Sequence, residues 1–291
     1  MNLSYKTQHS LKGVLFFIIA IFFISVVDTI CKSFTKELHA IQLVWGYFVG
    51  INLVLWIVFF LKGKKLSELR KTNRLQLQVF RPALLVCSIS SLFVGLTYLP
   101  IAEATAIGFV APLFITALSV PILKEKVGIH RWSAVIVGLI GVIIIIRPGS
   151  DLWHFASIMP LLGAIFFALF QILTRLLSIT ENTYTTLFFT GLGGLIWSSI
   201  IVPFVWVSPS QTHIIIFLLT GVLGALAHLC MISAFDRTEA SLLAPYNYTK
   251  LIWVAILGYL IFDDIPSHNM WIGAAVIVSA GFYIIYRERK K

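Results

Sequence analysis

The sequence predicts an all-α polytopic membrane protein with ten transmembrane helices. Of its 291 residues, 59% are hydrophobic and only 12% are charged, whereas a soluble domain carries about 25% charged residues. The apolar residues gather in ten segments, and most have the ~17–25 residues that a spanning helix needs. These runs are long, unbroken and rich in aromatic and branched residues, which excludes the alternating strands of a membrane barrel.

In chain order, the segments cover residues 11–33, 40–61, 79–99, 102–123, 129–147, 154–176, 184–206, 213–235, 240–262 and 269–287. The first follows a basic start and contains the apolar run Val14 to Val27. Asp28 comes next, where a cleaved signal peptide would have small residues, so we interpret this segment as a retained span. The connections are short, and the longest, residues 62–78, is strongly basic.

Positive charge predicts the orientation of the ten helices. With the N-terminus inside, 18 of the 22 Lys and Arg residues fall on the inner side, while Lys32, Lys36 and Arg147 fall outside and Lys250 falls within the membrane. Cytoplasmic loops carry this excess of positive charge, so both termini are expected on the cytoplasmic side of a bacterial inner membrane. The net charge of +10 therefore marks topology, and no nucleic-acid partner is expected.

The two halves of the chain, residues 1–150 and 151–291, resemble each other. Three groups of markers recur in the same order at offsets of 143, 136 and 139 residues: Asp28–Lys32 with Gln171–Arg175, Glu103-Ala104 with Glu239-Ala240, and Glu125 and Trp132 with Asp264 and Trp271. Each half holds five spans, an odd number, so the second repeat must insert upside down. Inverted repeats with interrupted helices indicate a secondary transporter whose site lies between the halves. A duplicated scaffold that moves nothing is the alternative.

The ninth segment carries the strongest functional signal. It contains Pro245, Tyr246, Asn247 and Lys250, and a proline inside a helix frees a backbone carbonyl. Lys250 lies about ten residues into the segment, or roughly 15 Å deep. A charge near the bilayer midplane costs several kcal/mol, so Lys250 is expected in a polar cavity, with snorkelling or structural pairing as the alternative. Pro112 interrupts the fourth segment in the same way.

Other polar residues within the spans are weighed between structure and function. Asp28 either pairs with Lys32 one helical turn away or binds a cationic group or coupling proton. Gln171 is a cavity candidate, whereas Arg175 is expected to anchor the inner side. For His228, a hydrogen bond between helices is favoured over a proton-linked switch. Glu103 and Glu239 are expected to stabilise helix N-termini.

Aromatic and small residues complete the pattern. Tyr98, Phe109 and Tyr246 lie near the interrupted helices and could stack on a planar or cationic ligand. Trp132 and Trp271 flank charged loops and are expected at the membrane interface. Close helix approaches are expected at small-residue pairs: Gly46/Gly50, Gly138/Gly141 and Gly221/Gly224.

The sequence carries no enzymatic motif. It has no GxxxxGK[ST] loop and no HExxH, so neither nucleotide hydrolysis nor metal catalysis is indicated. The three cysteines show no CxxC spacing, so neither a disulfide framework nor a metal site is expected. No cofactor is predicted.

Several motifs together identify a family: Thr97–Ala106 leading to Pro112, Lys124-Glu-Lys126 with Trp132, Ser233–Ser241, Ala244-Pro-Tyr246 and Gly258–Asp264. The chain resembles the EamA-type branch of the drug/metabolite transporter superfamily over almost its whole length. The resemblance implies a ten-helix carrier with two inverted EamA repeats and a central cavity lined mainly by helices three, four, eight and nine. The stretch Ala244-Pro-Tyr246-Asn-Tyr is also similar to S-adenosylmethionine uptake carriers.

The sequence therefore predicts a secondary transporter that moves a small organic metabolite by alternating access. Lys250 would hold a carboxylate or phosphate and Asp28 a cationic group, which favours an amino acid or an amino-acid-derived zwitterion, S-adenosylmethionine included. The predicted substrate-binding residues are Asp28, Tyr98, Phe109, Pro112, Gln171, His228, Pro245, Tyr246, Asn247 and Lys250. The alternative is a lipid-handling or non-transporting scaffold. Membrane lipid is an expected partner, and a homodimer is left open.

Overall fold

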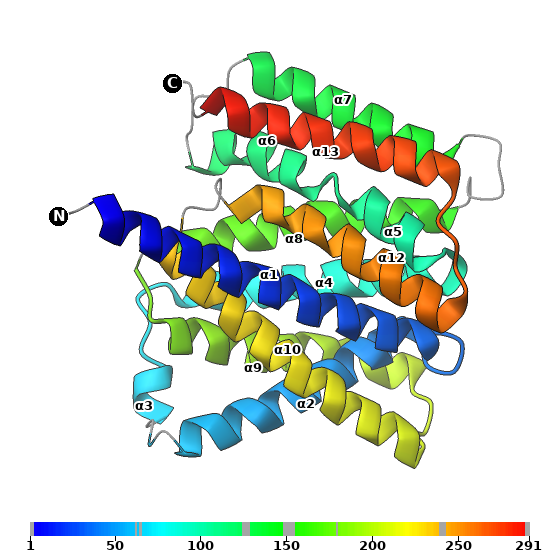
Figure 1. The fold of residues 1–291 in the computed structure, drawn as a ribbon. Coiled ribbons are helices and arrows are strands. Elements are labelled where there is room, and N and C mark those ends of the chain that lie inside the picture. The colour runs from blue at the N-terminus through cyan, green and yellow to red at the C-terminus, as the bar shows by residue number, and fades with distance from the viewer. Residues whose placement is uncertain are drawn as a thin grey trace.

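The computed structural model describes residues 3–61, 63, 66–123, 129–147, 155–178, 180–238 and 243–288. Within these residues every regular element is helical: α1 (Leu3–Ser33), α2 (Ala40–Leu61), α3 (Leu66–Leu69), α4 (Leu75–Tyr98), α5 (Ile101–Gly108), α6 (Ala111–Leu123), α7 (Ile129–Ile146), α8 (Phe155–Ser178), α9 (Thr183–Ile201), η1 (Val202–Val205), α10 (Gln211–Arg237), η2 (Ala244–Tyr248), α12 (Thr249–Phe262) and α13 (His268–Glu288). The long helices lie side by side, and α1 begins at the end of the bundle where α13 finishes (Figure 1). We call this the Leu3 end and the opposite one the Ser33 end.

The ten predicted segments all have a helical counterpart. Six helices of the described part, namely α1, α2, α4, α8, α9 and α10, are long and apolar enough to cross a bilayer by length and composition. The fourth segment is two helices, α5 and α6, and the ninth is the 3-10 turn η2 followed by α12. The third span begins at Leu75, four residues earlier than predicted.

The break between α5 and α6 follows from local chemistry. Pro112 has no backbone N–H, so the carbonyl of Gly108 loses its usual helical donor. The Phe109 N–H turns back to the Thr105 and Ala106 carbonyls at 3.1 and 3.2 Å, which closes α5 with a tight turn. Pro245 lies in η2, so both repeats have an irregular fourth span.

Helix packing follows the inverted symmetry of the repeats. The first helix of each repeat packs against the third helix of the other, which gives the pairs α1–α10 and α8–α4. The last helices, α7 and α13, pack against each other, and the interrupted spans contact the opposite first helices as α6–α8 and α12–α1. The ten helices therefore form two inverted five-helix repeats around a shared centre.

Each of the three predicted glycine pairs contributes a residue to a close contact between the repeats. A Cβ added to Gly50 of α2 would lie 2.8 Å from the Gly221 Cα of α10, and one added to Gly141 of α7 would lie 2.8 Å from the Gly273 carbonyl of α13. Real Cβ atoms do not approach backbone so closely, so larger residues would push these helices apart. The small residues set the spacing of the central bundle.

The structure corrects one expectation about charges and extends another about a helix N-terminus. Arg81 was counted among the inner-side charges, but its side chain is fully buried in α4. Glu103 lies in the first turn of α5, yet its Oε1 accepts a hydrogen bond from the Ser267 N–H, just before α13, at 3.2 Å. It therefore joins the two repeats in addition to occupying a helix N-terminus. Glu239 and Glu125 lie outside the described residues.

Candidate functional site

A central cavity lies between the two repeats. Its volume is about 140 Å³, which is room for on the order of ten water molecules. The walls come from α1, α2, α4, α5 and α6 of the first repeat and from α8, α10, η2 and α12 of the second. Most lining side chains are apolar, and a few polar groups converge on the space: Asp28, Tyr47, Ser88, Thr105, Gln171, His228, Asn247 and Lys250.

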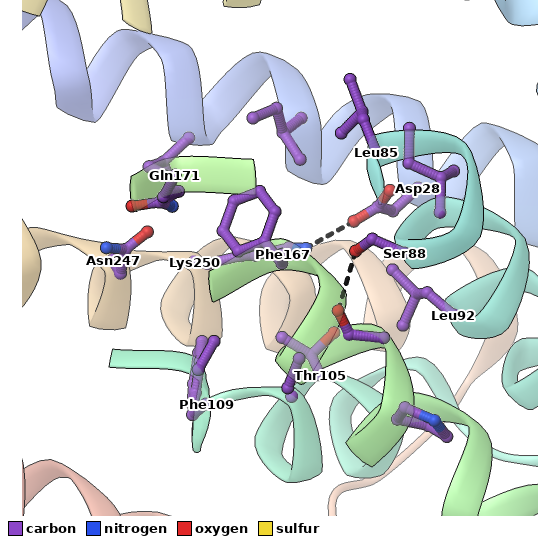
Figure 2. Close-up of a pocket in the computed structure, with 18 of the residues that line it drawn as sticks. Asp28, Leu85, Ser88, Leu92, Thr105, Phe109, Phe167, Gln171, Asn247 and Lys250 are labelled. Carbon is purple, nitrogen blue, oxygen red and sulfur yellow. Dashed lines mark hydrogen bonds and ion pairs between the residues drawn. The ribbon is translucent and has the colours of Figure 1, made fainter. Parts of the chain in front are cut away.

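An ion pair crosses this cavity. Lys250 Nζ of α12 lies 2.6 Å from Asp28 Oδ2 of α1, and the two side chains are only 18% and 7% exposed. Figure 2 shows the lysine extended toward the carboxylate, with Phe167 beside it. Because α12 belongs to the second repeat and α1 to the first, the pair joins the two halves. Both charges line the cavity and are accessible to a molecule inside it.

The local pairing of Asp28 with Lys32, left open from the sequence, is wrong. Lys32 Nζ lies 2.5 Å from Asp264 Oδ2 and 4.5 Å from the centroid of the Phe262 ring. The lysine therefore fastens the end of α1 to the end of α12. At the same Ser33 end, His213 Nε2 of α10 lies 2.9 Å from Glu37 Oε2. These pairs, with the Glu103–Ser267 hydrogen bond, tie the repeats together at the Ser33 end.

The mirror position of Asp28 also faces the cavity. Gln171 of α8 is buried and lines the space, and its Nε2 has no hydrogen-bond partner among the described residues. Asn247 of η2 lies nearby (Figure 2). An amide donor without a partner inside a cavity is a group that a ligand oxygen can satisfy.

An aromatic wall, formed by Phe109 and Phe167, also lines the cavity. Phe109, at the break after α5, lines the cavity, and its ring packs edge-to-face on Tyr248 at 5.5 Å between centroids. Phe167 of α8 lines the space as well and stacks on Phe170 at 6.2 Å. The cavity therefore offers aromatic rings as well as charges.

His228 is held by a partner that the sequence reading missed. Its Nε2 lies 3.0 Å from the hydroxyl oxygen of Tyr47 on α2, and both side chains are buried and line the cavity. The expected hydrogen bond between helices is therefore present. Gly224 makes room for it, since a Cβ there would lie 2.7 Å from the Tyr47 hydroxyl. The sequence signal for Tyr47 was its place inside the Gly46/Gly50 seam.

The remaining predicted residues lie elsewhere or are only partly described. Tyr98 ends α4 with its side chain 62% exposed, and it does not line the cavity. Tyr246 packs against a separate apolar cluster that includes Phe17, Ile21 and Leu243. Pro112 and Pro245 are placed in α6 and η2, but their side chains lie outside the described part.

Arg81 forms a second polar centre, distinct from the lining residues. Its guanidinium donates to Thr174 Oγ1 at 2.9 Å, to the Thr186 carbonyl at 3.0 Å and to Thr190 Oγ1. It also lies over the Phe170 ring, 5.0 Å from the centroid. These contacts tie α4 to α8 and α9 through neutral oxygens.

Comparison with known proteins gives a consistent result along the chain. The EamA-like transporter family model matches residues 11–147 and again residues 154–287. A crystal structure with 16% sequence identity superposes with a TM-score of 0.66 and covers 96% of both chains, which shows the shared fold. The predicted resemblance to this family is therefore confirmed.

Several curated bacterial transporters are similar over the full length. The S-adenosylmethionine uptake transporter of Rickettsia prowazekii is 30% identical over 292 residues, covering 100% of this chain and 97% of its own. The riboflavin transporter of Vibrio cholerae is 29% identical over 290 residues, covering 98% of this chain and 96% of its own. The pseudopaline exporter of Pseudomonas aeruginosa is 25% identical over 276 residues, with 92% and 94% covered.

These relatives are transporters and not enzymes, and they handle different small metabolites. Their similarity covers nearly the whole chain and therefore both repeats. The chain therefore belongs to the EamA-like transporter family, and it is a multi-pass bacterial membrane protein that transports a small metabolite.

Proposed function

We propose that this protein is a secondary transporter that moves an amino-acid-derived zwitterion by alternating access. The observation that carries the proposal is the Asp28–Lys250 ion pair, which spans the cavity at 2.6 Å. A zwitterion can replace this pair with two of its own, its carboxylate on Lys250 and its ammonium on Asp28. Charges buried in a membrane protein are rare and mark substrate or ion pathways.

The rest of the cavity fits a molecule with a flat apolar part. Phe109 and Phe167 contribute aromatic rings to the wall, and the amides of Gln171 and Asn247 supply a small number of polar contacts. Ligand pockets commonly combine such apolar walls with a few placed polar groups. We assign substrate binding to Asp28, Lys250, Gln171, Asn247, Phe109 and His228.

S-adenosylmethionine is the first candidate substrate. It has a carboxylate and an ammonium for the ion pair, a sulfonium, and an adenine ring for the aromatic wall. Riboflavin, which the Vibrio relative is named for, has a flat ring but neither a carboxylate nor an ammonium. The ion pair therefore favours S-adenosylmethionine, in line with the name of the Rickettsia relative.

We further propose that the carrier lies in the inner membrane with both termini in the cytoplasm. The Leu3 end carries most of the Lys and Arg residues by sequence count, and such residues favour the cytoplasmic side. The Ser33 end, where Lys32 meets Asp264, then faces outward. Reporter fusions at the C-terminus test this: a cytoplasmic reporter is expected to be active and a periplasmic one silent.

The deciding experiment is ligand-dependent thermal stability of the purified carrier in mild detergent. A ligand that binds only the folded state raises the melting temperature. The panel contains S-adenosylmethionine, S-adenosylhomocysteine, amino acids, nucleotides, riboflavin and polyamines. We expect a shift with S-adenosylmethionine that is lost in Lys250→Met and kept in Lys36→Met, a matched change at an exposed lysine.

Two results would count against the proposal. A shift with riboflavin that survives Lys250→Met would place recognition on the aromatic wall and remove the charge pair from binding. A shift only with lipids, or with nothing on the panel, would favour a lipid-handling or scaffold role. Uptake of the stabilising ligand into proteoliposomes then separates transport from binding alone.

A further inference from the structure

We propose that this carrier does not require an exchange partner: it returns across the membrane empty, with the Asp28–Lys250 ion pair closed. The inference rests on the proposed function, since it concerns the transport cycle at the same cavity. It assigns the protein net substrate flux without a counter-substrate, in contrast to obligatory exchange of one metabolite for another.

The physical basis is the cost of moving an unpaired charge through a membrane. A carrier whose empty cavity holds a lone lysine or a lone carboxylate must carry that charge through an occluded, water-poor state. Such a charge costs several kcal/mol or more, so the empty carrier waits until a counter-charged substrate binds. Obligatory exchange follows from this barrier.

The present cavity avoids that barrier. Among its described lining residues, Asp28 and Lys250 are the only ones of the types Asp, Glu, Lys and Arg. They pair with each other at 2.6 Å, so the cavity carries no net charge from these types when no ligand is bound. The pair joins α1 to α12, and closing it draws the two repeats together.

The other charges near the path do not disturb this balance. Lys32 is paired with Asp264 at 2.5 Å and does not line the cavity. Arg81 does not line it either and keeps three donated hydrogen bonds to α8 and α9. His228 shares its hydrogen bond with Tyr47.

In the loaded carrier the two protein charges are paired as well, and S-adenosylmethionine adds only its own sulfonium charge. A substrate carboxylate takes the place of Asp28 beside Lys250, and a substrate ammonium takes the place of Lys250 beside Asp28. The single ion pair within the protein is replaced by two ion pairs between protein and substrate, and no charge of the protein is left alone. Empty and loaded carriers are therefore both able to reorient.

The experiment compares two fluxes of labelled S-adenosylmethionine in proteoliposomes that contain the purified carrier. One set of vesicles is empty inside, and the other is preloaded with the unlabelled compound. We expect the initial uptake into empty vesicles to lie within about threefold of the uptake into preloaded ones. Uptake only into preloaded vesicles would overturn the inference while leaving the proposed transport function intact. No uptake into either set, beside active control vesicles, would instead overturn the proposed function with this substrate, and with it the inference.

Variants of the pair test the cause. In Asp28→Asn or Lys250→Gln one charge is left alone, so uptake into empty vesicles is expected to fall at least tenfold further than uptake into preloaded vesicles. The double variant Asp28→Asn/Lys250→Gln has no unpaired charge, and its ratio of the two fluxes is expected to return toward that of the wild type. Single variants that lose both fluxes equally, with a measurable residual flux, would show that the pair does not set the transport mode. If a single variant transports nothing, the wild-type comparison alone decides.

Discussion

Asp28 and Lys250, which are separated by 222 positions in the chain, place their charged atoms 2.6 Å apart in the central cavity. One belongs to the first span of the first repeat and the other to the interrupted span of the second. Both side chains are largely buried, so each depends on the other for its charge. The sequence predicts both as site residues, and the fold makes them partners.

Removing one member of the pair is expected to destabilise the protein more than removing both. Asp28→Asn leaves a buried ammonium and Lys250→Met a buried carboxylate, and breaking a buried pair costs about 3–5 kcal/mol. The double variant Asp28→Asn/Lys250→Met leaves no charge behind. Melting temperatures measured without ligand should therefore be higher for the double variant than for either single one. Losses that simply add would contradict the pairing.

Tyr47→Phe is expected to impair the carrier, whereas Tyr98→Phe is expected to change little. The first change leaves the buried His228 nitrogen without the partner that it has at 3.0 Å, at a cost of about 1–3 kcal/mol. The second alters a side chain that is 62% exposed and outside the cavity. Melting temperature and substrate affinity distinguish the two variants. A larger effect at Tyr98 would restore it as a site residue.

The Lys32–Asp264 pair is expected to hold the Ser33 end closed. Cys31, beside Lys32, is only 1% exposed and offers a native reporter. In a background with Cys87→Ser and Cys230→Ser, Asp264→Asn should raise the rate of labelling of Cys31 by a membrane-impermeant maleimide several-fold. Asp263→Asn is the matched control, because the structure shows no ion pair for Asp263 among the described residues. Equal rates in both variants would show that the pair is not a closure.

Uptake of S-adenosylmethionine is expected to depend on membrane potential. This compound carries one net positive charge at neutral pH, and the paired cavity adds none. A charge that crosses 100 mV gains about 2.3 kcal/mol, equivalent to about 50-fold accumulation at equilibrium. An inside-negative membrane potential imposed with valinomycin should therefore increase uptake. S-adenosylhomocysteine lacks the sulfonium charge, so any flux of it should not respond, and a response of both would contradict the charge count.

Arg81 is expected to be required for folding and not for recognition. Arg81→Lys cannot reproduce the fork of donors that reaches Thr174, Thr186 and Thr190. The melting temperature should fall, while the size of the ligand-induced shift should persist in the protein that remains folded. Arg74→Lys, at an exposed position, should leave both unchanged. Loss of the ligand shift with unchanged stability would make Arg81 a binding residue.

The sequence by itself determined the helical architecture and the inversion of the two repeats. Long apolar runs have few stable forms in a bilayer, because every backbone polar group must be bonded within the segment. That constraint fixed the helices, and five spans per repeat required the inversion. Lys250, Asp28, Gln171 and His228 stood out for the same reason, since polar groups inside such runs need a purpose or a partner.

Only the tertiary structure decided the partners. Residues 28 and 250, 32 and 264, and 47 and 228 are far apart in the chain, and which side chains meet depends on how the two repeats pack. From the sequence, Lys32 was the one partner that could be offered for Asp28, because helical spacing was the only geometry available. Arg81 was counted among the inner-side charges, and only the packing of α4 against α8 and α9 shows that it is buried between helices. Composition and periodicity determine where helices form, but contacts between helices distant in the sequence determine which partners their polar residues have.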